Sequence, residues 1–192
     1  NQLENLLINN IKKMTQSDRP LGFFLSGGID SSLAVSIASK INTADKIKAF
    51  NLSFDDSIYD ESKDAKIVAE KNNIDLKIKK LNHLDLIKNL DRIYDKFDEP
   101  FADPACFPLL ELSRFAKSYV DVAITGDGGD ELFGGYEYYR IAKIFEKFGY
   151  SKYIIYISKL LKFIKQNHKH SLLYEASKIS DPTKFFSFIR SF

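Results

Sequence analysis

The chain has 192 residues, a length typical of one domain of ordinary size. Its residues are 44% hydrophobic and 28% charged, so it can bury a sizeable core beneath a soluble surface. The 28 basic and 26 acidic residues leave a formal net charge of +2, and this near-balance argues against a general nucleic-acid coat protein.

The pattern of apolar residues predicts helices that alternate with strands. Apolar residues at helical spacing predict a first helix over residues 3–14, and the apolar run over 21–25 predicts a buried strand. In the next predicted helix, 30–39, we expect Leu33, Ala34 and Ile37 to face the core. The later elements, in chain order, are strand 47–54, helix 60–72, strand 74–81, helix 83–97, helix 106–118, strand 120–125 and a helix from about 131.

This alternation predicts an α/β fold with a doubly wound, mostly parallel sheet flanked by helices. We expect the α/β core to occupy residues 1–147. Residues 148–192 hold eight Lys/Arg against two Asp/Glu, and we expect them to form a basic helical extension. The lysines of this extension are expected on the solvated faces of packed helices, and an RNA contact is the alternative.

Seven of the nine glycines fall into two windows, each between a predicted strand and a predicted helix. In a parallel sheet that position is the carboxyl edge, where ligands bind. The first window is LSGGIDSS, in which Gly27 and Gly28 can turn N–H groups inward as an anion nest. The following helix directs its positive end to the same place.

The first window therefore predicts a phosphate or pyrophosphate site, to which three hydroxyls are added by Ser26, Ser31 and Ser32. A plain turn with a helix cap is the alternative. No lysine follows as in a Walker A loop. Asp30, among phosphates, suits a Mg²⁺ ligand better than a bare charge, with a cap as the alternative.

The second window is TGDGGDELFGGY, which crowds Asp127, Asp130 and Glu131 into five positions. Carboxylates this close repel one another unless a metal or another cation intervenes. The spacing does not fit an EF-hand. Because the window follows a predicted buried strand, we favour a metal–phosphate and acid/base role over an acidic surface turn.

These windows, together with DEPFADPA at 98–105 and the continuation YEYYR at 136–140, resemble the PP-loop ATP pyrophosphatases. Specifically, they resemble the synthetase domain of glutamine-dependent asparagine synthetases. The resemblance covers most of residues 3–145 and implies the adenine nucleotide alpha-hydrolase-like fold. It also implies a family domain that continues beyond residue 192.

The resemblance implies ATP and Mg²⁺ as cofactors and assigns roles residue by residue. The residues that would hold the pyrophosphate part of ATP are Ser26, Gly27, Gly28, Asp30, Ser31 and Ser32. The residues that resemble nucleoside or further ATP contacts are Leu25, Leu52, Thr125 and Gly126. Asp30 and Asp130 would share Mg²⁺. Asp127 stands at an acidic position important for adenylation, where some members of the family have Glu.

The implied reaction has two steps. The β-carboxylate of aspartate attacks the α-phosphorus of ATP, and ammonia then displaces AMP to give asparagine. Asp127 could accept a proton from the attacking nitrogen as a general base. Ammonia would come from glutamine through an N-terminal glutaminase domain of the full-length protein, so we expect this chain alone to be poorly active. A homodimer is compatible with the resemblance.

Other adenylating relatives remain as alternatives, namely a β-lactam synthetase or a peptide-cyclising enzyme that acts on another carboxylate. A PP-loop enzyme that modifies tRNA is a third, although we do not expect nucleic acid as a partner. The single cysteine, Cys106, excludes an intramolecular disulfide and favours a reducing compartment. No apolar run is long enough for a bilayer, and no secretory signal is seen. We therefore expect a cytoplasmic location.

Overall fold

The computed structural model describes residues 2–42, 46–55, 60–82 and 105–136, and isolated positions elsewhere. The chain divides into two units, Asn1–Asp127 and Gly128–Phe192, and each is described by itself. The predicted helix 83–97 and nearly all of the predicted extension 148–192 lie outside the described residues. The predicted boundary between 147 and 148 therefore stays a prediction.

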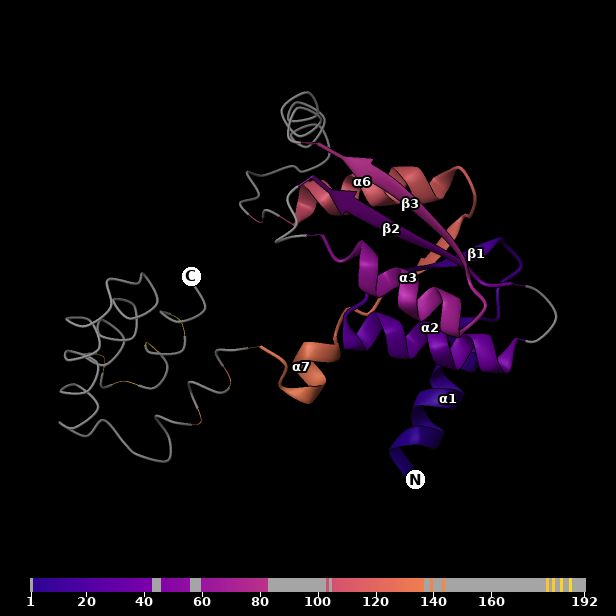
Figure 1. Ribbon diagram of the computed structural model, residues 1–192. Helices are drawn as coiled ribbons and strands as arrows, with labels where there is room; N and C mark the ends of the chain where they lie inside the picture. The colour runs from indigo at the N-terminus through magenta and orange to yellow at the C-terminus, as the bar shows by residue number, and fades with distance from the viewer. Residues whose placement is uncertain are drawn as a thin grey trace. The chain divides into compact units, whose positions relative to one another are not determined.

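The first unit is built on a parallel sheet. Its described strands are β1 (Leu21–Phe24), β2 (Lys48–Phe54), β3 (Asp75–Leu81) and β4 (Val122–Ile124). They lie in the order β3-β2-β1-β4, and every neighbouring pair is parallel. Each predicted strand thus forms within a few residues of its expected bounds. Helices cross between the parallel strands (Figure 1), so the predicted doubly wound α/β fold is confirmed.

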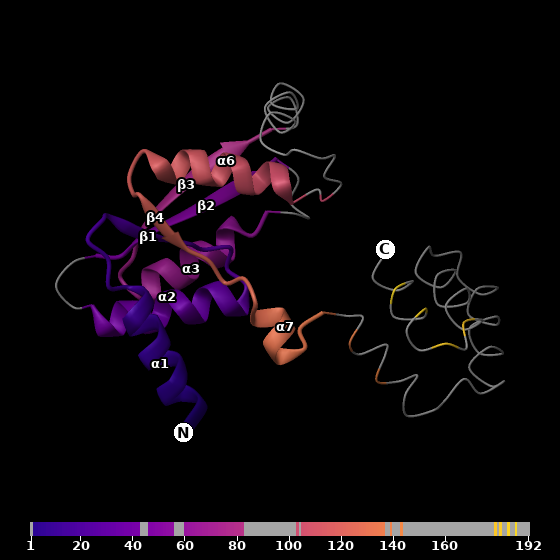
Figure 2. The ribbon, with the colours of Figure 1, turned by 180° about the vertical axis from the view of Figure 1, so that it is seen from behind.

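Helices cover both faces of this sheet. Figures 1 and 2 show α2 (Ile29–Ile41) and α3 (Ser62–Lys71) on one face of the sheet and α6 (Cys106–Lys117) on the other. The first helix, α1 (Gln2–Met14), packs against α2. None of the described helices combines the length and apolar character that a bilayer crossing requires.

The alternation of side chains along β2 explains why both faces are covered. Ala49 lies in the core cluster shared with α2 and α3, whereas Phe50 and Leu52 lie in clusters shared with α6. Successive residues of a strand point to opposite faces. A strand that is apolar on both faces must be buried on both, as is typical of parallel sheets.

The strand register brings the carboxyl ends of the central strands together. Phe24 of β1 pairs with Phe50 of β2, and Phe23 pairs with Ile124, the last residue of β4. The chain leaves β1 and β4 at the same edge. Both glycine windows of the sequence therefore begin at one edge of the sheet.

The buried face of α2 differs in part from the expected one, since Ala34 and Ile37 pack against the core as predicted but Leu33 does not. Leu33, predicted to face the core, is 43% exposed, whereas Val35 is fully buried. The buried positions are Ser31, Val35 and Ala38, which lie on one side of the helix. A serine thus takes the place of a larger apolar residue at the start of this stripe, next to the first glycine window.

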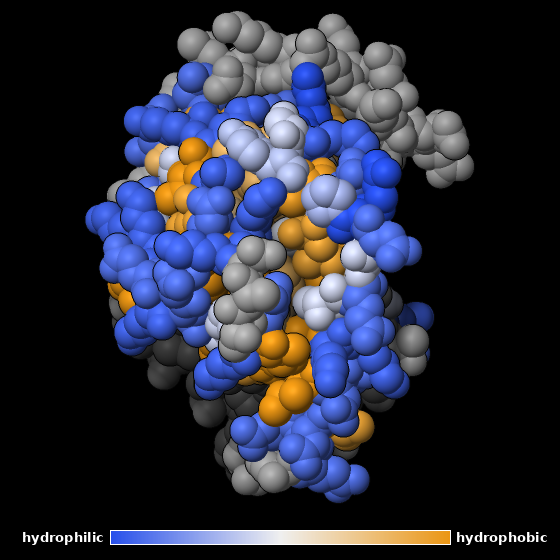
Figure 3. Space-filling view, turned by 90° about the vertical axis from the view of Figure 1, so that its right-hand side faces the viewer, coloured by the Kyte–Doolittle hydropathy of each residue, from blue (hydrophilic) through white to orange (hydrophobic). Residues whose placement is uncertain are grey.

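Apolar side chains also reach the surface. Leu3, Leu6 and Met14 of α1 are each about half exposed, while Ile11 is buried in the core. Figure 3 shows one face of the molecule, mostly hydrophilic, with apolar side chains gathered in a strip through its centre. Of the apolar side chains of α1 named above, the described residues bury Ile11 and leave the other three half exposed.

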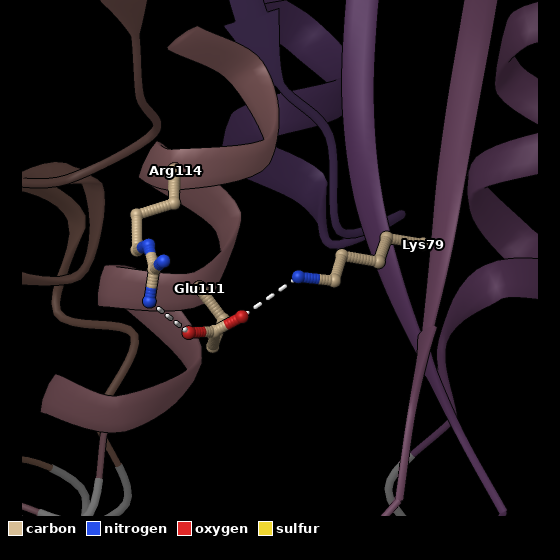
Figure 4. Close-up of polar contacts among 3 residues, drawn as sticks. All are labelled: Lys79, Glu111 and Arg114. Atoms are coloured by element: carbon tan, nitrogen blue, oxygen red, sulfur yellow. Dashed lines mark hydrogen bonds and ion pairs between the residues drawn. The ribbon is translucent and has the colours of Figure 1, made fainter. Parts of the chain in front are cut away.

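A buried carboxylate links α6 to β3. The Glu111 side chain is 6% exposed, and its Oε2 accepts a hydrogen bond of 2.7 Å from Lys79 Nζ. Its Oε1 accepts a bond of 3.2 Å from Arg114 one turn along the helix (Figure 4). A charge this deeply buried is tolerated because both oxygens are paired.

Candidate active site

The loop from Ser26 to Gly28 joins β1 to α2. Gly27 has φ +95°, a backbone conformation that L side chains rarely adopt. Gly28 is the N-cap of α2, and no side chain caps this helix end. The first N–H groups of a helix have no partner inside the helix, and together they carry a partial positive charge. This end of α2 thus has the chemistry of an anion site.

The three serines of the window have different roles. Ser31 is buried, and its Oγ donates to the Gly28 carbonyl at 3.3 Å and accepts from the Ser26 N–H at 3.3 Å. The Ser26 Oγ lies 3.1 Å from the Ser31 Oγ and accepts the Gly28 N–H at 3.1 Å. The Ser32 Oγ is buried without a hydrogen-bond partner in the described part of the chain. Ser31 therefore closes the loop from inside, and Ser32 keeps an unused hydroxyl.

One detail of the predicted anion nest differs from the expectation. The Gly28 N–H is already bonded to Ser26 Oγ, so it is not free to face an anion. The nest that the sequence suggests at Gly27 and Gly28 is therefore occupied in part by the loop's own hydroxyl. The uncapped start of α2 remains the stronger anion-binding feature of the loop.

The second glycine window lies directly against the first. A Cβ added at Gly126 would lie 2.8 Å from the Ser31 N and 3.2 Å from the Asp30 Cβ. Only a residue without a side chain lets the segment after β4 approach the first turn of α2 this closely. Four predicted site residues therefore come together here: Asp30, Ser31, Thr125 and Gly126.

Asp127 is held beyond the end of β4 by Thr125. The Thr125 hydroxyl donates to the Asp127 Oδ2 at 2.8 Å and accepts the Asp127 N–H at 3.3 Å. Asp127 itself is exposed. The carboxylate thus has a fixed orientation and open access, as a base that acts on a bound substrate would need.

The start of α3 is a further part of this site that sequence reasoning missed. A Cβ added at Gly27 would lie 2.7 Å from the Asp64 Cβ and 2.8 Å from the Ala65 N, so the loop lies on the first turn of α3. Two helix N-termini, those of α2 and α3, therefore meet the loop. The small residues Ala65 and Ala69 on the buried side of α3 were the available clue to such close packing.

The Asp60 carboxylate caps the start of α3. Its Oδ1 accepts the Ser62 N–H at 3.1 Å. Hydrogen bonds from the Ser62 side chain and backbone lower the pKa of the Asp60 carboxyl. An ionised carboxylate at a helix start stabilises the helix.

Of the predicted nucleoside contacts, Leu25 directly follows β1, and Leu52 lies in the neighbouring strand β2, two residues before its end. Both side chains are buried, on opposite faces of the sheet. The Leu25 N–H is bonded to the Phe50 carbonyl, so of the two residues it is Leu52 whose backbone groups a ligand at the edge could bond. Asn51, which sequence analysis did not single out, donates its Nδ2 to the Leu25 carbonyl at 2.8 Å. A polar residue within the apolar run of β2 was the clue to it.

Asp130 belongs to the second unit. There α7 (Gly129–Phe133) begins after Gly128, with φ +90°, and ends at Gly134, with φ +69°. A Cβ added at Gly135 would overlap the Asp130 carboxylate. The predicted sharing of Mg²⁺ by Asp30 and Asp130 stays a prediction. Within the described residues, no group of three or more His, Cys, Asp or Glu could hold a metal.

Comparisons with known proteins point to one family. The family model for asparagine synthase matches residues 2–184. The chain is 34% identical to asparagine synthetase (glutamine-hydrolyzing) 1 of Bacillus subtilis over 165 residues, which are 83% of this chain and 26% of that protein. It is 36% identical to putative asparagine synthetase (glutamine-hydrolyzing) 2 of Methanocaldococcus jannaschii over 137 residues, which are 69% of this chain and 26% of that protein.

The chain thus spans about a quarter of the length of these relatives. Among solved structures, an NMN synthetase from Francisella tularensis is similar with a TM-score of 0.48 and 23% identity. That similarity covers 69% of this chain and 56% of the other.

Proposed function

This chain belongs to the asparagine synthase family, and from that premise we propose that the protein carrying it uses ATP to activate the side-chain carboxylate of aspartate for amidation. The pyrophosphate part of ATP would lie at the loop between β1 and α2. The observation that carries the proposal is the meeting of the two glycine windows, where Gly126 lies on the first turn of α2.

The residues at this edge fit a nucleotide phosphate. Support comes from the uncapped start of α2 and the unused Ser32 hydroxyl, whereas the start of α3 beneath Gly27 is already capped by the Asp60 carboxylate. Helix N-termini and hydroxyl donors stabilise phosphate charge. The closeness of the two windows leaves no room for a side chain at Gly126, and the first turn of α3 leaves none at Gly27.

In the first step, a carboxylate oxygen of aspartate would form a bond to the α-phosphorus as the bond to the β-phosphate oxygen breaks. The products are β-aspartyl-AMP and pyrophosphate. When bound, Mg²⁺ would neutralise charge on the phosphates, with Asp30 and Asp130 as its proposed ligands. The start of α2 would stabilise the leaving pyrophosphate, because its N–H groups are already oriented before the reaction.

In the second step, the nitrogen of ammonia would attack the acyl carbon, and AMP would leave with the electron pair of the broken C–O bond. The nitrogen must lose a proton to give the neutral amide. Asp127 is the proposed base, because Thr125 orients its carboxylate and leaves it exposed. Hydrolysis of glutamine in an N-terminal glutaminase domain is the proposed source of ammonia.

The test uses the full-length protein that contains this chain, with ATP, Mg²⁺ and a panel of carboxylates. We expect aspartate-dependent release of pyrophosphate rather than phosphate, and asparagine once ammonia or glutamine is added. Pyrophosphate release that depends on another carboxylate would favour a β-lactam synthetase or a peptide cyclase. Release that depends on tRNA would favour a tRNA-modifying enzyme. Phosphate as the product would refute the proposal.

The Asp127→Asn variant tests the proposed base. General-base catalysis contributes about 10²–10⁴-fold, so we expect a loss of this order in asparagine formation. The matched control is Asp121→Asn, at the opposite end of β4, where the carboxylate pairs with Arg19 on the surface. Equal activity of the two variants would show that Asp127 is not the base.

A further inference from the structure

A buried amide lies between the two predicted nucleoside contacts. Asn51 is 4% exposed and belongs to β2, next to Leu52 in sequence. Its Nδ2 donates to the Leu25 carbonyl at 2.8 Å. Its Oδ1 is buried without a hydrogen-bond partner among the described residues. An unpaired buried acceptor is costly, so a residue of this kind calls for an explanation beyond packing.

The backbone around Asn51 shows what the amide does. The Leu25 N–H donates to the Phe50 carbonyl at 2.9 Å, so Phe50 turns its backbone groups toward β1. The Asp75 N–H donates to the Ile47 carbonyl at 2.9 Å, so odd-numbered residues of β2 turn theirs toward β3. By this alternation the N–H and C=O of Leu52 point to the β1 side.

A regular parallel ladder would continue with a bond from the Leu52 N–H to the Leu25 carbonyl. In this sheet the Leu25 carbonyl accepts a hydrogen bond from the side chain of Asn51 instead. The ladder between β1 and β2 therefore ends at Leu25. The Leu52 N–H and C=O lie just past that end and have no backbone partner on the β1 side among the described residues.

We propose that Asn51 is a positioning residue for base recognition: its amide takes the Leu25 carbonyl and thereby reserves the peptide groups of Leu52 for the nucleotide base. The Leu52 N–H can pair with an acceptor on the edge of a base, and the Leu52 C=O can pair with a donor beside that acceptor. A 6-aminopurine has this pattern, whereas a 6-oxopurine has the reverse. The inference rests on the proposed function, because that function places a nucleotide at this edge.

The test compares the native full-length protein with Asn51→Ala, using ATP and its 6-oxo analogue ITP. We expect the native protein to prefer ATP. Asn51→Ala should raise the KM for ATP about tenfold, which corresponds to about 1.4 kcal/mol, and change kcat at saturating ATP less than twofold. The preference for ATP over ITP should shrink by a similar factor, because the Leu52 N–H can then turn to the Leu25 carbonyl.

The chain offers a matched control. Asn72 donates its Nδ2 to the Val68 carbonyl, also at 2.8 Å, at the end of α3. Asn72→Ala removes the same kind of bond and should leave both the KM and the base preference unchanged. If Asn51→Ala does not fold, Asn51→Leu, which keeps the side-chain size without the donor, gives the same readout.

Two failures are distinguishable. If the native protein releases pyrophosphate but a folded Asn51 variant keeps its KM and its preference for ATP, Asn51 is only structural and the inference is wrong. If the native protein shows no ATP-dependent activity and no binding of ATP, the proposed function fails, and the inference fails with it.

Discussion

Replacing Gly27 by alanine tests the packing of the first loop on α3. Two costs are expected. An L residue at positive φ costs roughly 1–2 kcal/mol, and Gly27 has φ +95°. The new Cβ would also lie 2.7 Å from the Asp64 Cβ and 2.8 Å from the Ala65 backbone N. Forcing an extra methyl into a packed site costs about 1–3 kcal/mol, so the sum is about 2–5 kcal/mol.

Two further glycines separate these costs. Gly126→Ala meets the Ser31 N at 2.8 Å without a positive φ, so only the packing cost of about 1–3 kcal/mol applies. Gly28→Ala has φ −64° and meets only the Ser26 Oγ at 3.2 Å. There the smaller entropy of the unfolded chain should offset the contact, and we expect a change between zero and a gain of about 1 kcal/mol.

The assay is equilibrium unfolding in urea, with the free energy and the m-value fitted for each variant. The free energy of unfolding should fall most for Gly27→Ala, less for Gly126→Ala and not at all for Gly28→Ala. If Gly27→Ala were no more destabilising than Gly28→Ala, the loop would not lie on α3. The case for two helix starts at one site would then be refuted.

Two other predictions concern charges. Lys79→Met should lower the free energy of unfolding by about 1.5–3 kcal/mol, because the buried Glu111 loses a partner at 2.7 Å. The control is Lys80→Met, which breaks an equally short but exposed pair with Asp55 and should lower the free energy of unfolding by at most about 1 kcal/mol. Equal losses in urea unfolding would contradict the buried pair. Asp60→Asn should be less stable than the native chain at neutral pH, because hydrogen bonds to Ser62 lower the pKa of the Asp60 carboxyl. A carboxyl with a lowered folded-state pKa stabilises above its unfolded-state pKa, about 3.9, and loses this as pH falls through the folded value. The difference in melting temperature should therefore vanish in acid, and a difference independent of pH would exclude the carboxylate as its cause.

Within the described residues, the sequence was sufficient to predict the strands and helices but not how they pack on one another. Strands β1 to β4 form near their expected bounds because short apolar runs between turn residues carry that information locally. Asp30 was predicted as a site residue from the first glycine window, and Thr125 and Gly126 were assigned from the family resemblance. The register of β1 with β4 and the close approach of Gly126 to α2 bring these predicted residues together.

Three features escaped prediction because each depends on residues far apart in the chain. The first turn of α3 lies under Gly27, the Asn51 amide reaches Leu25, and Lys79 pairs with Glu111. In none of these pairs does the local sequence around one partner identify the other. Leu33 was assigned to the wrong side for a related reason. A helix with apolar residues on several sides does not show by periodicity alone which side the sheet will cover.

The arrangement of the first loop bears on how catalysis could work. Charge stabilisation is efficient when the groups that supply it are already in place before the reaction. Ser31 bonds to Ser26 and Gly28 from inside the loop, α3 packs against Gly27, and Gly126 packs against the first turn of α2. Each of these supports involves a small or buried residue, so none of them presents a large side chain to a nucleotide. The loop is therefore held by its surroundings, and the start of α2 stays available to phosphate.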